Sequence, residues 1–381
     1  MSLTGGLFLT LVGLLTGVSF VLVVLFWPVL AGRGPGRVAA RAGSLLLVNV
    51  LVLLTAATQL NAHYLFFADW TDLHGAIDGT VIKTSLTRGS TAMKAASRRV
   101  SGSAATAPGS VPALAADKQH GDVLTYTVTG PASGVVSTVV VRLPPGYRDP
   151  VNAGTSYPVL ETFQGYPGSP SQWVDTMSIG SVMSRAVAAK QMRDALVVSP
   201  QVEVPAGVDT ECVNGVPGDP QLETWLTQDV PSWVAQTFRV STSRSSWATL
   251  GFSTGGWCAA MAAMLHPAQY GAAIVLGGYF RPEFGPGYDP YPLHSPLARR
   301  YDLVALAKRS PPSVAMWLET SHSDAVSYSS SAALLRVARS PLSLKAVVLR
   351  HAGHRISLWR GLLPETLTWL GTNVPGFSPL H

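Results

Sequence analysis

The sequence predicts an α/β fold, a mostly parallel sheet flanked by helices, preceded by a hairpin of two membrane-spanning helices. Two long uncharged apolar stretches near the N-terminus predict the hairpin. From Asp122 onward, short apolar or β-branched runs alternate with segments of helical spacing, which predicts the sheet. One of these runs is followed by a serine between glycines. This pattern is typical of a sharp turn from a strand into a helix.

The apolar stretches cover about residues 7–30 and 43–60, within a predicted anchor domain of residues 1–67. Leu7–Leu30 contains no charge and is long enough to cross a bilayer. A cleaved signal peptide is the alternative for this span, but no basic residue precedes it and a second apolar stretch follows closely. The sequence therefore predicts two transmembrane helices that bind the chain to a lipid bilayer.

The charges around the two spans predict their orientation. Arg33, Arg37 and Arg41 lie between the spans, whereas the first charges after the second span are aspartates. Because cytoplasmic loops are enriched in arginine and lysine, the connecting loop is expected in the cytoplasm. The rest of the chain is then expected on the extracytoplasmic side of the plasma membrane.

Residues 68–118 are predicted to be a juxtamembrane segment followed by a flexible linker. Aromatic side chains are frequent up to Trp70, as in the headgroup zone of a bilayer. Lys83–Lys118 is rich in Ser, Ala, Gly and Thr, and Ser101–Ser110 is almost entirely of this composition. Such a composition buries little apolar surface, so we expect no secondary structure there.

The formal charge of +6 does not indicate nucleic-acid binding, because residues 119–381 carry 18 basic and 17 acidic residues and are nearly neutral. The nine histidines and two cysteines show no spacing typical of a metal site. The sequence predicts no nucleic-acid partner, no cofactor and no metal.

Residues 119–381 are long enough for one large α/β domain. The predicted strands are Val135–Leu143, Pro158–Phe163, Ala195–Pro200, Trp247–Leu250, Ala272–Leu276, Ser313–Glu319 and Lys345–Leu349. The predicted helices are Ser181–Lys190, Thr224–Gln236, Gly256–His266, Ser329–Arg339 and Pro364–Leu370.

The segment Gly251-Phe252-Ser253-Thr254-Gly255 matches the pattern of a nucleophile elbow. Gly251 and Gly255 remove side chains where the strand and the helix must nearly touch. A serine hydroxyl becomes a useful nucleophile when a neutral imidazole accepts its proton and a carboxylate orients that imidazole. Ser253 is therefore the candidate nucleophile, and the chain downstream must supply its partners.

Asp324 follows one predicted strand and His354 follows the next, so the chain order is Ser253, Asp324, His354. Each residue lies at the carboxyl end of a strand, where α/β sheets place their sites. Glu319 stays an alternative for the acid. His351 is the other candidate base, but a residue still within the strand would point sideways.

From about Gly134 to Leu370 the chain resembles the esterase family of α/β-hydrolases, which contains S-formylglutathione hydrolase (esterase D) and the secreted mycolyltransferases. The resemblance rests on Val139–Tyr147, on Gln164–Ser169 and on Gly353-His354 with Trp359 downstream. Two positions depart from the family pattern: Gln164 replaces the usual histidine, and Ala352 replaces the first glycine of Gly-Gly-His.

The resemblance implies an α/β-hydrolase fold with Ser253, Asp324 and His354 as the triad. It also implies that the backbone N–H groups of Tyr166 and Thr254 form the oxyanion hole. Gln164 leaves the backbone donor intact but changes the side chain that orients this loop.

Cys212 and Cys258 are the two cysteines of the chain, and outside the membrane such a pair is expected to be oxidised. The sequence predicts a disulfide between the loop after the third predicted strand and the helix that follows the nucleophile. Two buried thiols too far apart to meet are the alternative.

These observations predict a membrane-anchored extracytoplasmic serine esterase that cleaves a carboxylic ester through an acyl-enzyme. Proximity to the bilayer favours an ester of a lipid or envelope component. An acyltransferase of mycolyltransferase type and a catalytically inactive envelope-binding module are the alternatives. The aromatic segment Tyr279–Tyr301 is expected either to line an acyl-binding groove or to be an ordinary surface loop.

Overall fold

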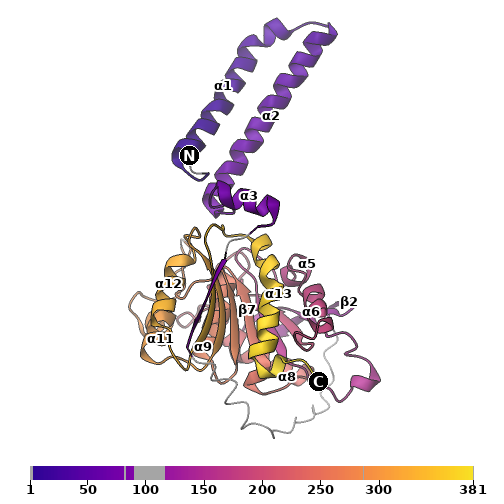
Figure 1. The fold of residues 1–381 in the computed structure, drawn as a ribbon, viewed down its shortest axis with the longest axis vertical. Helices are drawn as coiled ribbons and strands as arrows, with labels where there is room; N and C mark the ends of the chain where they lie inside the picture. Colours follow the sequence, from indigo (N-terminus) through magenta and orange to yellow (C-terminus); the bar gives the residue numbers. More distant parts are fainter. Residues whose placement is uncertain (1–2, 81–82, 90–115, 286, 381) are drawn as a thin grey trace. The chain divides into compact units, whose positions relative to one another are not determined.

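The computed structural model describes residues 3–80, 83–89, 116–285 and 287–380, which form two compact units (Figure 1). The first unit contains the described residues up to 80 together with two short loop segments, residues 322–324 and 350–355. The second unit contains the remainder of the chain from Lys83 onward.

Three helices make up most of the first unit: α1 (Gly6–Leu30), α2 (Pro35–Tyr64) and α3 (Trp70–Asp78). The first two form an antiparallel hairpin, and both are long and apolar enough to cross a membrane by length and composition. Between them the hydroxyl oxygens of Thr16 and Thr55 lie 2.7 Å apart. The second helix begins well before the predicted apolar stretch, because Pro35 is suited to a first helical turn.

The second unit is built on a ten-stranded sheet with the order β1-β10-β9-β8-β7-β5-β6-β4-β3-β2. Its strands are β1 (Lys83–Arg88), β2 (Lys118–His120), β3 (Val123–Thr129), β4 (Val136–Arg142), β5 (Val159–Phe163), β6 (Leu196–Pro200), β7 (Trp247–Phe252), β8 (Ala272–Leu276), β9 (Ala315–Ser321) and β10 (Ser343–Leu349). From β10 to β6 neighbouring strands are parallel, and the strands outside them pair antiparallel. The predicted fold class is confirmed.

Helices cover this sheet on its faces: α5 (Gln172–Asp175), α6 (Ile179–Ala188), α7 (Leu222–Thr224), α8 (Val230–Thr237), α9 (Thr254–Leu265), α10 (Pro296–Arg300), α11 (Leu303–Arg309), α12 (Tyr328–Val337) and α13 (Ile356–Asn373). In Figure 1 α13 crosses in front of the strands, and α6 packs against it. In a cluster of buried hydrophobic side chains, residues of the strands pack with residues of α8, α9, α11 and α12. The central strands are buried along their whole length, as expected for a parallel sheet with both faces covered.

The predicted helix Thr224–Gln236 is divided. Residues Trp225–Asp229 form a π-helical turn between α7 and α8. Pro231 has no backbone N–H to donate into the preceding turn, which interrupts the regular hydrogen-bond ladder.

Strand β1 corrects the prediction that the chain is a flexible linker from Lys83 onward. Lys83–Arg88 pairs antiparallel with β10 along its length, and the ammonium of Lys83 contacts Glu365 at 2.5 Å. All six of its residues are exposed. The strand therefore lacks the alternation of apolar and polar residues by which a half-buried strand is predicted from sequence. The segment Ser101–Ser110, also assigned to the linker, lies outside the described residues.

Candidate active site

Ser253 lies between the end of β7 and the start of α9, where the chain turns sharply. Its backbone has φ 55° and ψ −128°, a conformation that non-glycine residues rarely adopt. Gly251 permits this turn, because a Cβ there would lie 1.8 Å from the carbonyl oxygen of Gly255. A serine held in this backbone conformation between a strand and a helix has the geometry that a nucleophile elbow requires.

The loop after β5 lies directly beside this elbow. A Cβ on Gly165 would be 3.1 Å from the Cβ of Ser253, and a Cβ on Gly255 would be 2.1 Å from the carbonyl oxygen of Phe163. Tyr166 therefore follows a residue in contact with the serine. Thr254 begins α9, where backbone N–H groups lack partners within the helix. Tyr166 and Thr254 carry the two amides that the resemblance to the esterase family implies for the oxyanion hole.

Gln164, the departure from the family pattern, fastens the loop after β5. Its side chain is buried, and its Nε2 donates to Oε1 of Gln201, just beyond β6. The same oxygen accepts the backbone N–H of Val202 at 2.9 Å. An amide-to-amide contact thus orients this loop where family members carry a histidine.

In the first unit, Nδ1 of His354 lies 2.9 Å from Oδ2 of Asp324. Asp324 is only 3% exposed. A carboxylate in this position holds an imidazole in one tautomer and orientation, with Nε2 directed elsewhere as a base. The structure therefore brings the predicted base and the predicted acid together.

The alternative residues make other contacts. Glu319 lies inside β9, and its Oε2 accepts the indole N–H of Trp359 at 3.1 Å. His351 pairs through Nδ1 with Oδ2 of Asp69 at 2.8 Å.

Sheet topology relates the serine to the segments that carry this pair. β7, β8, β9 and β10 are neighbours and run parallel, so their carboxyl ends lie at one edge of the sheet. Ser253 directly follows β7, and residues 322–324 and 350–355 directly follow β9 and β10. That edge is where α/β sheets build their sites.

The family model "Putative esterase" matches residues 132–369, more than half of the chain. The chain belongs to the esterase family. A Corynebacterium glutamicum protein of uncharacterized function is 31% identical over 144 residues, which are 38% of this esterase and 33% of that relative. This esterase thus matches about a third of that relative's length.

Solved structures of low sequence identity share the fold of this esterase. A ferulic acid esterase is 20% identical with a TM-score of 0.55, over 66% of this chain and 98% of its own. An S-formylglutathione hydrolase from Agrobacterium tumefaciens is 15% identical with a TM-score of 0.55, over 66% and 95%. The fluorophosphonate-binding serine hydrolase F of Staphylococcus aureus is 15% identical with a TM-score of 0.53, over 65% and 97%.

The predicted disulfide of this esterase is confirmed. Cys212 and Cys258 are bonded, with their Cα atoms 5.7 Å apart. Because Cys258 lies in α9, the bond fastens the loop after β6 to the helix that follows Ser253.

Sequence reading missed a buried polar group beneath the start of α9. The hydroxyl of Tyr279 donates to Oε1 of Glu211 at 2.5 Å and lies 3.2 Å from Oγ1 of Thr254. Burial raises the pKa of Glu211 well above its usual range, and the neighbouring Asp209 raises it further. The only feature of the sequence that points to this buried group is that Glu211 directly precedes Cys212, a residue expected in a disulfide.

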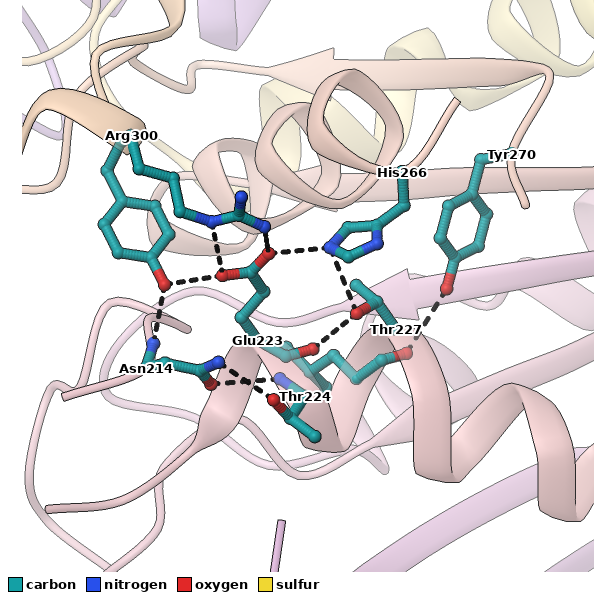
Figure 2. A network of polar contacts seen from close by, with 9 residues as sticks. Asn214, Glu223, Thr224, Thr227, His266, Tyr270 and Arg300 are labelled. Atoms are coloured by element: carbon teal, nitrogen blue, oxygen red, sulfur yellow. Dashed lines mark hydrogen bonds and ion pairs between the residues drawn. The ribbon is translucent and has the colours of Figure 1, made fainter. Parts of the chain in front are cut away.

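Glu223 fixes the far end of the aromatic segment Tyr279–Tyr301 (Figure 2). Its buried carboxylate accepts hydrogen bonds from the hydroxyl of Tyr301 at 2.6 Å and from the guanidinium of Arg300, and it contacts Nε2 of His266 at 2.7 Å. Burial alone would raise the pKa of Glu223, but these three partners lower it to about 2. The segment is therefore held against α7 and α9 by an ionised group.

A cavity of about 350 Å³ lies on the same segment. Apolar, basic and acidic side chains line it together, and the acidic one, Asp302, pairs with Arg281. The lining residues are Arg281, Pro282, Phe284, Tyr291, Leu293, His294, Ala298, Arg299 and Asp302.

Proposed function

We propose that this esterase is a membrane-anchored extracytoplasmic serine hydrolase that cleaves a carboxylic ester through an acyl-enzyme. Ser253 is the nucleophile, His354 is the general base and Asp324 orients it. The hydrogen bond between Asp324 and His354 carries the proposal, because an oriented imidazole is what converts a serine hydroxyl into a nucleophile. The elbow backbone of Ser253 supports it independently.

In the proposed reaction, Oγ of Ser253 attacks the ester carbonyl carbon while His354 accepts the hydroxyl proton. The carbonyl oxygen becomes negatively charged and is stabilised by the backbone N–H groups of Tyr166 and Thr254. His354 then donates its proton to the departing alkoxide, which leaves an acyl-serine. Water, deprotonated by His354, attacks this acyl group. His354 then returns the proton to Oγ of Ser253 as the bond to the acyl carbon breaks and the acid is released. Asp324 stays ionised throughout.

The two apolar helices support a membrane anchor, and the arginines between them favour a cytoplasmic connecting loop. Within the first unit, the backbone N–H of His354 donates to the carbonyl oxygen of Leu65 at 2.8 Å. Leu65 directly follows α2, so the proposed base belongs to the boundary between apolar and aqueous surroundings. We therefore propose an ester of a lipid or envelope component as the substrate.

Fluorophosphonate labelling tests the nucleophile without knowledge of the substrate. Membranes that carry the wild-type protein are expected to label, and those with Ser253→Ala are expected not to label. Ser181→Ala is the matched control, because Ser181 is exposed on α6 and only bonds the carbonyl oxygen of Ser178. Equal labelling of wild type and Ser253→Ala would contradict the proposal.

Acyl esters of graded chain length, supplied with and without an alcohol acceptor, then separate hydrolysis from transfer. Hydrolysis releases free acid in both cases. Transfer produces a new ester only when the acceptor is present.

A further inference from the structure

Two backbone amides of the loop that carries His354 are held by the segment after α2 and by the first turn of α3. We call Arg350–Arg355 the histidine loop and Leu65–Asp72 the juxtamembrane corner. The N–H of His354 donates to the carbonyl oxygen of Leu65 at 2.8 Å. The N–H of Gly353 donates to Oδ2 of Asp72 at 2.7 Å. Both segments belong to the first unit.

Asp72 is the centre of this arrangement, and it is only 3% exposed. Besides Gly353, its Oδ2 accepts Nη1 of Arg355 at 2.7 Å and the N–H of Ala68 at 3.0 Å. Arg355 is itself buried and also donates to the carbonyl oxygen of Phe66 at 3.1 Å. Asp72 and Arg355 compensate each other's charge, because removing either one would leave an uncompensated buried charge.

The two segments also pack without a gap at Gly353. A Cβ at this position would lie 2.3 Å from the carbonyl oxygen of Phe66 and 2.4 Å from that of Leu65. Any larger residue would push the juxtamembrane corner away from the histidine loop. The glycine before His354 is therefore required by the corner itself.

A second contact between side chains of the two segments lies at the start of the histidine loop. Nδ1 of His351 is 2.8 Å from Oδ2 of Asp69. Burial would raise the pKa of Asp69, but the backbone N–H of Asp72 and the His351 ring lower it. Asp69 also caps α3, accepting the N–H of Asp72 at 2.9 Å. Asp69 thus both caps α3 within the corner and holds the start of the histidine loop.

We propose that Asp72 is a positioning residue for His354, so that the membrane anchor is part of the active site and not only a tether. The inference rests on the proposed role of His354 as the base. Asp72 holds Gly353 and Arg355, the residues on either side of His354, while Asp324 holds its ring. The orientation of the base then depends on the integrity of the anchor.

Asp72→Asn in the full-length, detergent-solubilised protein tests this role, because the substitution keeps the shape of the side chain and removes its charge. Misplacing a catalytic group by about 1 Å costs on the order of 100-fold in rate, and we expect kcat and the fluorophosphonate labelling rate to fall by about that factor. KM for a soluble aryl ester is expected to change by less than about threefold, since Asp72 touches no substrate.

Two further variants test whether the loss of rate is specific to the pair of Asp72 and Arg355. Asp78→Asn makes the same charge change at an exposed position on α3 and should leave the labelling rate at the wild-type value. Arg355→Lys keeps the cation but loses the guanidinium fork, and it should give a loss of about tenfold, smaller than that of Asp72→Asn.

The outcomes separate the inference from the proposed function. A wild-type protein without Ser253-dependent labelling overturns both. A wild-type protein that labels beside an Asp72→Asn variant that labels equally fast overturns only the inference. An Asp72→Asn variant that loses labelling together with cooperative thermal unfolding also overturns it, because the role is then structural. A selective loss of kcat, with unfolding unchanged, is the expected result.

Discussion

The imidazole of His354 and the carboxylate of Asp324 form a hydrogen bond of 2.9 Å across 30 residues of sequence. Both residues are more than four-fifths buried in their side chains, at 13% and 4% exposure. Solvent therefore competes weakly for this contact, and the ring has one well-defined orientation.

Asp324→Asn is expected to lower kcat by about 10⁴-fold with little change in KM, because an amide stabilises the wrong imidazole tautomer. Steady-state kinetics on a soluble ester measure this loss. Glu319→Gln is the control, since a glutamine carbonyl still accepts the indole N–H of Trp359. A larger loss in Glu319→Gln than in Asp324→Asn would assign the acid to Glu319.

Replacing both Cys212 and Cys258 by serine is expected to lower the free energy of unfolding. The bond closes a loop with a sequence separation of 46, for which chain entropy gives about 4 kcal/mol. Urea unfolding of the double variant measures the change. Reducing the wild-type protein should reproduce it, and a reduced wild type as stable as the oxidised protein would contradict the prediction.

Glu223 is expected to make stability depend on pH in acid. Its pKa is about 2 in the folded state against an ordinary 4.5, so its contribution is complete above 4.5 and is lost as pH falls through 2. This shift corresponds to roughly 3 kcal/mol. Glu223→Gln should be less stable by about that amount at pH 7.

Urea unfolding at several pH values tests this contribution of Glu223. The difference in unfolding free energy between wild type and Glu223→Gln should shrink as the pH falls below 4.5. A constant difference down to pH 2 would show that the loss comes from packing and not from the carboxylate charge.

Glu161 is expected to give the stability the opposite dependence on pH from Glu223. Complete burial raises its pKa to about 8, although the hydroxyl of Tyr270 contacts it at 2.7 Å. Between pH 4.5 and 8 the unfolded chain ionises Glu161 while the folded protein keeps it neutral, so stability falls as pH rises through this window.

Glu161→Gln removes this titration. Its free energy of unfolding relative to wild type should rise between pH 5 and pH 8, by up to about 4 kcal/mol. Chemical unfolding at both pH values measures the difference. A relative stability that does not change with pH would mean that Glu161 is ionised in the folded protein.

The elements predicted correctly are those whose signals are short-range. β8 has its predicted bounds, Ala272–Leu276, because a buried strand is a compact apolar run between turns. The sharp turn from β7 into α9 was readable because two glycines lie within two residues of Ser253. The disulfide was readable because the chain offers one pairing.

Contacts between distant residues were not predictable in this way. Arg355 and Asp72 are 283 residues apart, and a single arginine or aspartate resembles any surface charge in a sequence. Glu223 and Arg300 are likewise 77 residues apart. Such pairs form because the fold brings distant elements together, and no local sequence pattern predicts that.

The strand β1 decides where a shortened version of this protein should start. A fragment that begins at residue 119 would lack Lys83–Arg88 and leave the backbone N–H and C=O groups on the outer side of β10 unpaired. Open strand edges of this kind recruit strands from other molecules and lead to aggregation. A recombinant fragment made to study the sheet without its anchor, and not its activity, is therefore best begun at Lys83, so that it retains its own edge strand.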